Sequence, residues 1–148
     1  MNNDKYPVAI GKTSMVYEFV SEGEKGRISK LVIYTETHLH NFFNLGFGDK
    51  NEETGEIDDR SVTNNGDKEK VLTTVASTLY MFTDVYQDAL IFAVGSNKAR
   101  TRLYRMGITM NLSAIEADFE IFGFCHEQWL PFKKGVNFEA FLAKRKKK

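Results

Sequence analysis

Hydrophobic and polar residues alternate along the first third of the chain, which predicts β-strands. In SMVYEFVS the alternation places Met15, Tyr17 and Phe19 on one face, and RISKLVIYT and NFFNLGFG alternate in the same way. A glycine-containing turn, EGEKG, separates the first two of these segments. Together they predict an antiparallel meander. A shorter strand at YPVAI contains Pro7, which fits a sheet edge or the first position of a strand.

The apolar spacing then changes to that of a helix. Asp67 can cap the start of a helix predicted over residues 67–84. A second amphipathic helix is predicted over residues 97–112, with Ser96 or Asn97 as its cap. The apolar residues that recur at helical spacing are Val71, Leu72, Val75, Ala76, Leu79 and Phe82 in the first helix, and Ala99, Leu103, Met106 and Met110 in the second.

Three apolar segments outside these helices predict further strands. ALIFAVGS is almost wholly apolar, which is typical of a central strand covered on both faces, and DFEIFGFC and EQWLPF predict two more. A last helix is predicted from about Asn137, packed through Phe138, Phe141 and Leu142. Grouped strands followed by interspersed helices favour an α+β fold. We expect a twisted, mainly antiparallel sheet of five to seven strands, with two long helices and a C-terminal helix on one face.

Length and composition are those of one domain. A chain of 148 residues with 42% hydrophobic residues can bury a core of its own, so residues 1–148 are expected to form a single domain. Residues 49–66 are polar and acidic, and they predict a long mobile loop with a short strand around Ile57. Residues 144–148, KRKKK, predict a basic tail at the end of the last helix.

Composition also limits the class of protein. The net charge is zero, so the chain lacks the domain-wide basic field of many nucleic-acid-binding proteins. The sole cysteine, Cys125, excludes an intrachain disulfide and a multi-cysteine metal site. The start MNNDKYPVAIGK does not resemble a signal peptide, and no run of eighteen apolar residues occurs. We therefore expect a cytoplasmic protein that does not contact a membrane.

The segment GSNKARTRLYRMGI, residues 95–108, contains the strongest candidate site. A strand, a Gly-Ser turn and a helix start leave amide groups free, and the helix dipole adds positive potential, so an anion can bind there. Arg102 and Arg105 are three residues apart and share a face of the helix, whereas Arg100 lies on the other side. The residues assigned to this ligand site are Ser96, Asn97, Arg100, Arg102, Tyr104 and Arg105.

Other interpretations of these residues remain open. The segment lacks the GxxxxGK[ST] and GxGxxG patterns of phosphate-binding loops, and its arginines can instead pair with the acidic residues between Glu52 and Asp59. His38 and His40 can share one side of an extended segment with Glu36, but a polar turn explains them equally well. We therefore expect no metal and no cofactor.

Cys125 and His126 are adjacent in the sequence, which is unfavourable for catalysis. Neighbouring residues on a strand point to opposite faces, so the pair does not form a nucleophile and its base.

Four segments together resemble an uncharacterised family of small bacterial proteins of about this length. The segments are NLGFGD, NNGDKEKVLTTVA, GSNKARTRLYRMGI and NFEAFL, and the resemblance covers nearly the whole chain. The resemblance implies a bacterial, cytoplasmic, single-domain protein. It implies no activity, ligand or catalytic residue.

Three functions follow from the arginine-rich helix start. We expect a non-enzymatic binding protein that contacts a phosphate-bearing or acidic partner, either nucleic acid or an acidic protein. An alternative is a small metal-independent ribonuclease or toxin-like enzyme, in which the arginines stabilise charge and Tyr104 or a histidine moves protons. The absence of a clear acid–base pair counts against this enzyme. A third possibility is a protein-interaction module, and the sequence leaves the oligomeric state open.

Overall fold

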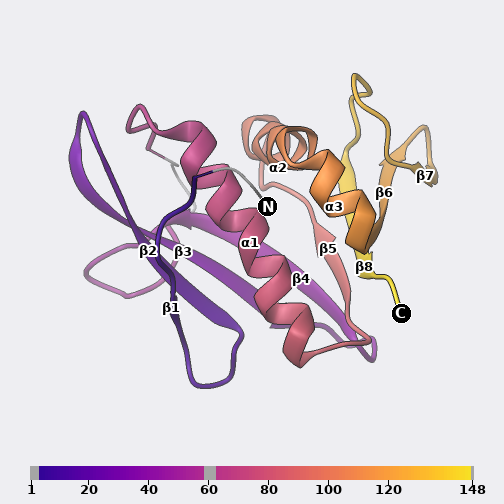
Figure 1. Cartoon of the computed structure of the whole chain (residues 1–148), viewed down its shortest axis with the longest axis horizontal. Helices are drawn as coiled ribbons and strands as arrows, with labels where there is room; N and C mark the ends of the chain where they lie inside the picture. Colours follow the sequence, from indigo (N-terminus) through magenta and orange to yellow (C-terminus); the bar gives the residue numbers. More distant parts are fainter. Residues whose placement is uncertain (1–3, 59–62, 148) are drawn as a thin grey trace.

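The computed structural model describes residues 4–58 and 63–147, which fold into one mixed sheet with helices on one face (Figure 1). Within these ranges the sheet has eight strands in the order β1-β2-β3-β4-β5-β8-β6-β7. Neighbouring strands are antiparallel except β4 and β5, which are parallel. The strands are β1 (Ala9–Ile10), β2 (Val16–Gly23), β3 (Gly26–Glu36), β4 (Phe42–Asp49), β5 (Leu90–Ala93), β6 (Phe119–Cys125), β7 (Gln128–Pro131) and β8 (Ala140–Arg145).

The N-terminal meander is formed by β2, β3 and β4, as the alternation predicts. Tyr17 and Phe19 are buried on the face that meets the helices, and Met15 lies just before β2. On β4 the buried residues are Phe43, Leu45 and Phe47. The short strand β1 forms the edge of the sheet beside β2, and Pro7 precedes it.

In the described part of the chain, three helices cover one face of the sheet: α1 (Lys68–Val85), α2 (Lys98–Met110) and α3 (Leu112–Asp118). The expected second helix is interrupted at Asn111, which ends α2 and begins α3. The Asn111 side-chain amide donates to the carbonyl oxygen of Gly107 at 2.9 Å. In a continuous helix that carbonyl would accept from the Asn111 backbone instead, so the side chain competes with the helix.

The caps of the two long helices differ from each other. Asn97 caps α2 as expected, since its side-chain oxygen accepts from the Arg100 backbone amide at 2.9 Å. Asp67 occupies the cap position of α1 but makes no capping hydrogen bond. Its carboxylate accepts instead from the hydroxyls of Ser21, at 2.6 Å, and Tyr6. Asp67 therefore joins α1 to the N-terminal segment and to β2.

The expected C-terminal helix from Asn137 is wrong, because residues 140–145 form strand β8 between β5 and β6. Phe141 and Ala143 are buried toward the helices with the period of a strand. Over the described residues the sheet has eight strands, whereas five to seven were expected. The α+β class is confirmed. The basic segment 144–148 thus begins inside a strand rather than at a helix end, and Lys148 lies outside the described residues.

Residues 49–66, which link β4 to α1, are anchored at both ends. Asp49 is 8% exposed and Asn65 is 1% exposed. The expected strand around Ile57 is a single antiparallel bridge to Lys50. Residues 59–62 lie outside the described residues, so the mobility of this loop stays a prediction.

The core lies between the sheet and the helices. Tyr34 on β3 stacks on Phe82 of α1 with ring centroids 4.1 Å apart, and its hydroxyl hydrogen-bonds to the Thr78 hydroxyl at 2.7 Å. Within the described ranges, no helix combines the length and apolar character needed to cross a membrane.

Candidate functional site

The turn between β5 and α2 is held tightly by its own residues. A Cβ atom at Gly95 would lie 2.3 Å from the Thr101 backbone nitrogen, so only glycine fits there. The Gly95 amide donates to the Thr101 hydroxyl at 3.1 Å, and Asn97 is extended with φ −150°. These contacts fix the direction in which the amino end of α2 points.

An open groove of about 780 Å³ runs along this end of α2. One wall is the first two turns of the helix, and the other is the segment 137–139 before β8. Of the described charged side chains that line it, Lys98, Arg102 and Arg105 are basic and Glu139 is acidic. The groove is therefore positive, and the amino end of the helix dipole adds to that potential.

The six residues assigned to the site from the sequence divide between two sides of α2. Asn97, Arg102 and Arg105 line the groove, and Ser96 is exposed in the turn beside it. Arg105 donates to the side-chain oxygen of Asn137 across the groove. Arg100 and Tyr104 point into the protein.

Arg100 connects α2 to the sheet and to the loop after β4. It is 8% exposed, and its guanidinium donates to the carbonyl oxygens of Phe47, at 3.1 Å, and Asp58, at 2.6 Å. These two bonds join Arg100 to strand β4 and to the loop after it, and the side chain is turned away from the groove. Asp59, which the sequence offered as another partner, lies outside the described residues.

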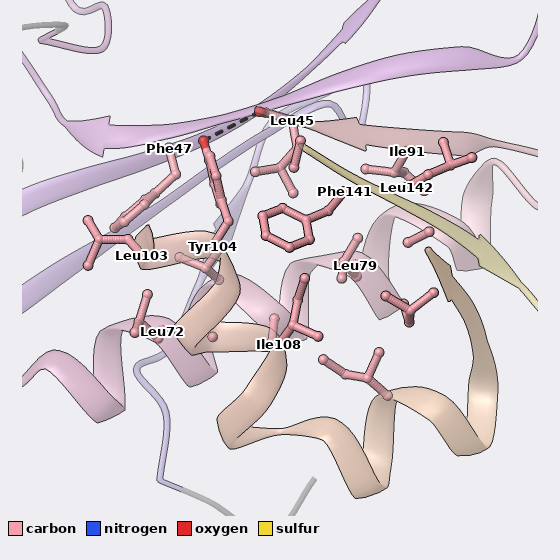
Figure 2. A pocket seen from close by; sticks show the side chains of 17 residues that line it. Leu45, Phe47, Leu72, Leu79, Ile91, Leu103, Tyr104, Ile108, Phe141 and Leu142 are labelled. Atoms are coloured by element: carbon pink, nitrogen blue, oxygen red, sulfur yellow. Dashed lines mark hydrogen bonds between the residues drawn. The ribbon is translucent and has the colours of Figure 1, made fainter. Parts of the chain in front are cut away.

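Tyr104 faces an apolar cavity beneath α2 (Figure 2). Its hydroxyl points to the Leu45 carbonyl oxygen at 3.5 Å. Burial raises the pKa of Tyr104 to about 12, although the nearby charge of Arg100 lowers it. The hydroxyl therefore stays protonated near neutral pH and lies on the opposite side of α2 from the groove.

The cavity has a volume of about 60 Å³ and lies between the helices and strands β4, β5, β6 and β8. Its lining is almost entirely apolar, which is typical of a cavity that holds no water. Residues that contribute to the lining include Leu72, Leu79, Leu103, Ile108 and Phe141.

Gly107 and Gly123 both line the core, but an added methyl group has opposite effects at the two positions. At Gly107 a Cβ atom would meet Leu72 at 3.6 Å, an ordinary contact at the cavity edge. We expect Gly107→Ala to raise the free energy of unfolding by about 1 kcal/mol, because alanine favours the helix. At Gly123 a Cβ atom would lie 2.3 Å from the Phe138 ring. Gly123→Ala should lower the same quantity by about 1–3 kcal/mol through overpacking.

Urea unfolding of both variants and the parent measures this difference. A loss of stability in Gly107→Ala equal to that in Gly123→Ala would show that the space beside α2 is filled in solution.

The histidines lie in turns. His38 and His40 are exposed in the turn that precedes β4. Strands β4 and β5 are parallel, so this turn lies near the start of β5, whereas the groove follows the end of β5. His126 is exposed in the turn after β6, and Cys125 beside it is buried. Over the described residues, no three His, Cys, Asp or Glu side chains are grouped so that they could hold a metal ion.

A buried ion pair that the sequence analysis missed lies under the start of α1. The Lys30 ammonium is fully buried, contacts the Asp49 carboxylate and donates to the Thr63 carbonyl oxygen at 2.9 Å. The Thr63 amide in turn donates to the other Asp49 oxygen at 2.9 Å. Within the described ranges, every buried side-chain nitrogen and oxygen has a partner. The pair is thus a closed structural unit with no group directed at a ligand.

Two groove residues were also missed, Asn137 and Glu139. They come from a segment that the sequence analysis assigned to a helix, and only the strand β8 brings them beside α2. Lys98 was within the quoted segment but was not assigned to the site.

Comparison with known proteins finds a family but no function. The sequence model of a family of unknown function, DUF6934, matches residues 2–146, which is nearly the whole chain. No curated protein and no solved structure matches. The resemblance to an uncharacterised family is therefore confirmed, and no activity comes with it.

Proposed function

Because the chain belongs to DUF6934, a family of unknown function, we propose a function from its geometry: it is a non-enzymatic binding protein whose α2 groove receives a phosphate-bearing or acidic partner. The observation that carries this proposal is the joint position of Lys98, Arg102 and Arg105 along one groove at the amino end of a helix. Anions are favoured at such helix ends, and guanidinium groups donate two parallel hydrogen bonds to phosphate or carboxylate.

The arginines of the groove are suited to this role in different ways. Arg102 is exposed and makes no hydrogen bond or ion pair with any described residue, so its donors are available. Arg105 is oriented across the groove by Asn137. The volume of about 780 Å³ falls within the range of small-molecule sites, and the groove is open enough for a chain segment. We also propose that the protein works in the bacterial cytoplasm, where nucleotides and nucleic acids supply phosphate groups.

The alternative functions have less support. Tyr104 faces the cavity, and no histidine lines the groove in the described part of the chain, so the residues that the ribonuclease interpretation assigns to proton transfer lie away from the groove arginines. A protein-interaction module is the form of the proposal in which the ligand is an acidic protein surface. The same binding experiment distinguishes it.

The double variant Arg102→Ala/Arg105→Ala should lose affinity for an anionic ligand by at least about 100-fold. Each hydrogen bond to a charged group contributes about 1.5–3 kcal/mol, and two such groups are removed. The measurement is fluorescence anisotropy with a labelled single-stranded RNA oligomer, ATP and a polyglutamate peptide as separate probes. For single-stranded RNA, the magnitude of the slope of log affinity against log salt should also decrease by about 1.4, since each phosphate contact contributes about 0.7.

The matched control removes two exposed lysines that flank the edge strand β1, as Lys5→Ala/Lys12→Ala. This variant carries the same net charge as the arginine variant but keeps the groove. A loss of affinity of equal size in both variants would mean that overall charge, and not the groove, binds the probe. Identical binding by the arginine variant and the parent would remove the proposal.

A further inference from the structure

The sheet has a second face that the three helices leave uncovered (Figure 1). We call this the outer face. Residues on it alternate along each strand with the buried residues that face the helices. Its composition differs between the two halves of the sheet.

On the C-terminal half of the sheet the outer face is apolar. The register places Phe92 of β5 opposite Leu142 of β8, and Leu142 opposite Phe122 of β6. On β2, in contrast, the outer positions include Glu18 and Glu22. An antiparallel sheet that faces water on one side carries polar residues on that side. The apolar half therefore has the composition of a sheet with a second layer packed on it.

Four aromatic side chains form a continuous row across this face, which we call the aromatic row. Phe42 of β4 lies 6.0 Å from Phe92 of β5, measured between ring centroids. Phe92 lies 5.9 Å from Trp129 of β7, and Trp129 lies 5.1 Å from Phe124 of β6. Trp129 is 41% exposed, which is high for an aromatic ring of this size. Phe42, Phe92 and Phe124 are partly exposed, so the row presents apolar surface to solvent, and an apolar surface patch is a feature of interaction sites.

The charges on this face favour a second copy of the chain as the occupant. In the described part of β6 and β8 the charged outer residues are Glu120 and Lys144, which lie opposite each other in the register. A nucleic acid would require an excess of basic residues, whereas this face is balanced and the whole chain has zero net charge. Two identical faces related by a two-fold axis can place Glu120 of one copy against Lys144 of the other.

We propose that the protein is a homodimer in which the outer faces of β5, β8, β6 and β7 pack on each other through the aromatic row. Sheets packed in this way bury both inner faces, with their side chains interdigitated. The inference concerns the opposite face of the sheet from α2 and does not rest on the function proposed for the groove.

The test uses sedimentation velocity and intrinsic fluorescence from about 1 to about 100 µM protein, a range suited to micromolar affinity. Trp129 is the sole tryptophan of the chain, so its emission reports directly on this face. We expect a dimer at high concentration, and the emission maximum should move to shorter wavelength as the dimer forms. Trp129→Lys should raise the dimer dissociation constant by about tenfold or more. The control Val85→Lys, at an exposed apolar residue of α1, should change it by less than about twofold.

A charge exchange tests the arrangement further. Lys144→Glu should raise the dissociation constant, since like charges then meet across the interface, and Glu120→Lys added to it should restore the parent value. A cooperative thermal unfolding transition in each variant is the control that its monomer is folded. A parent protein that stays monomeric at about 100 µM would overturn the proposal. So would an unchanged dimer in Trp129→Lys, or a monomer whose Trp129 emission responds to single-stranded RNA.

Discussion

Replacing Lys30 by methionine is expected to lower the free energy of unfolding by about 3–5 kcal/mol, the cost of removing one partner from a buried ion pair. Methionine fills a similar volume, so the loss of packing is small. The variant leaves the Asp49 carboxylate buried without its cation and takes the donor away from the Thr63 carbonyl oxygen. Urea unfolding followed by circular dichroism measures the change.

A neighbouring ion pair supplies the control for this prediction. Lys50 and Glu18 are 3.1 Å apart, with 26% and 36% of their side chains exposed, and Lys50→Met should cost no more than about 1 kcal/mol. The double variant Lys30→Met/Asp49→Leu should recover part of the stability, because no charge is then left unpaired, while the Thr63 amide and carbonyl groups still lack their partners. Equal destabilisation by Lys30→Met and Lys50→Met would mean that water reaches Lys30 in solution.

The parts of the fold that the sequence predicted are those in which local pattern and packing agree. The apolar stripe of α1 and the alternation of β4 each allow only one secondary structure that buries them. Residues 140–143 are all apolar, so the segment shows neither the alternation of a half-exposed strand nor the spacing of an amphipathic helix. Such a short apolar run fits a helix or a strand that is buried on both faces equally well. Strands β5 and β6 each have backbone groups that need a hydrogen-bonding neighbour, and β8 pairs with both of them. This pairing favours the strand. That information lies in residues distant in the sequence.

The positions of the residues assigned to the candidate site agree with the sequence prediction only in part. The helical spacing of Arg102 and Arg105 correctly indicated one shared face, because that relation is local. The burial of Arg100 depends on where β4 and the loop after it lie, which no local pattern contains. A signal for the buried ion pair did exist, since Lys30 occupies the same strand face as Val32 and Tyr34. A lysine in line with core residues indicates a buried partner.

Replacing Arg100 by alanine is expected to lower the free energy of unfolding by about 3 kcal/mol or more. The guanidinium donates to the carbonyl oxygens of Phe47 and Asp58, and a hydrogen bond to a charged group contributes about 1.5–3 kcal/mol. With alanine, both carbonyl oxygens would lose their donor at a buried site that water does not readily enter. Arg100→Lys should recover only part of the loss, because an ammonium group cannot reach two divergent acceptors as a planar guanidinium does.

The control is Arg102→Ala on the groove side of the same helix, two residues away. Arg102 is exposed, so its replacement should change the free energy of unfolding by no more than about 0.5 kcal/mol. Arg102→Ala should also weaken binding of the anionic probe without changing the urea midpoint, whereas Arg100→Ala should lower the urea midpoint. Equal shifts of the urea midpoint in Arg100→Ala and Arg102→Ala would show that both arginines face solvent. The division of α2 into an inward side and a groove side would then be wrong, and with it the choice of Arg102 and Arg105 as the ligand-binding pair.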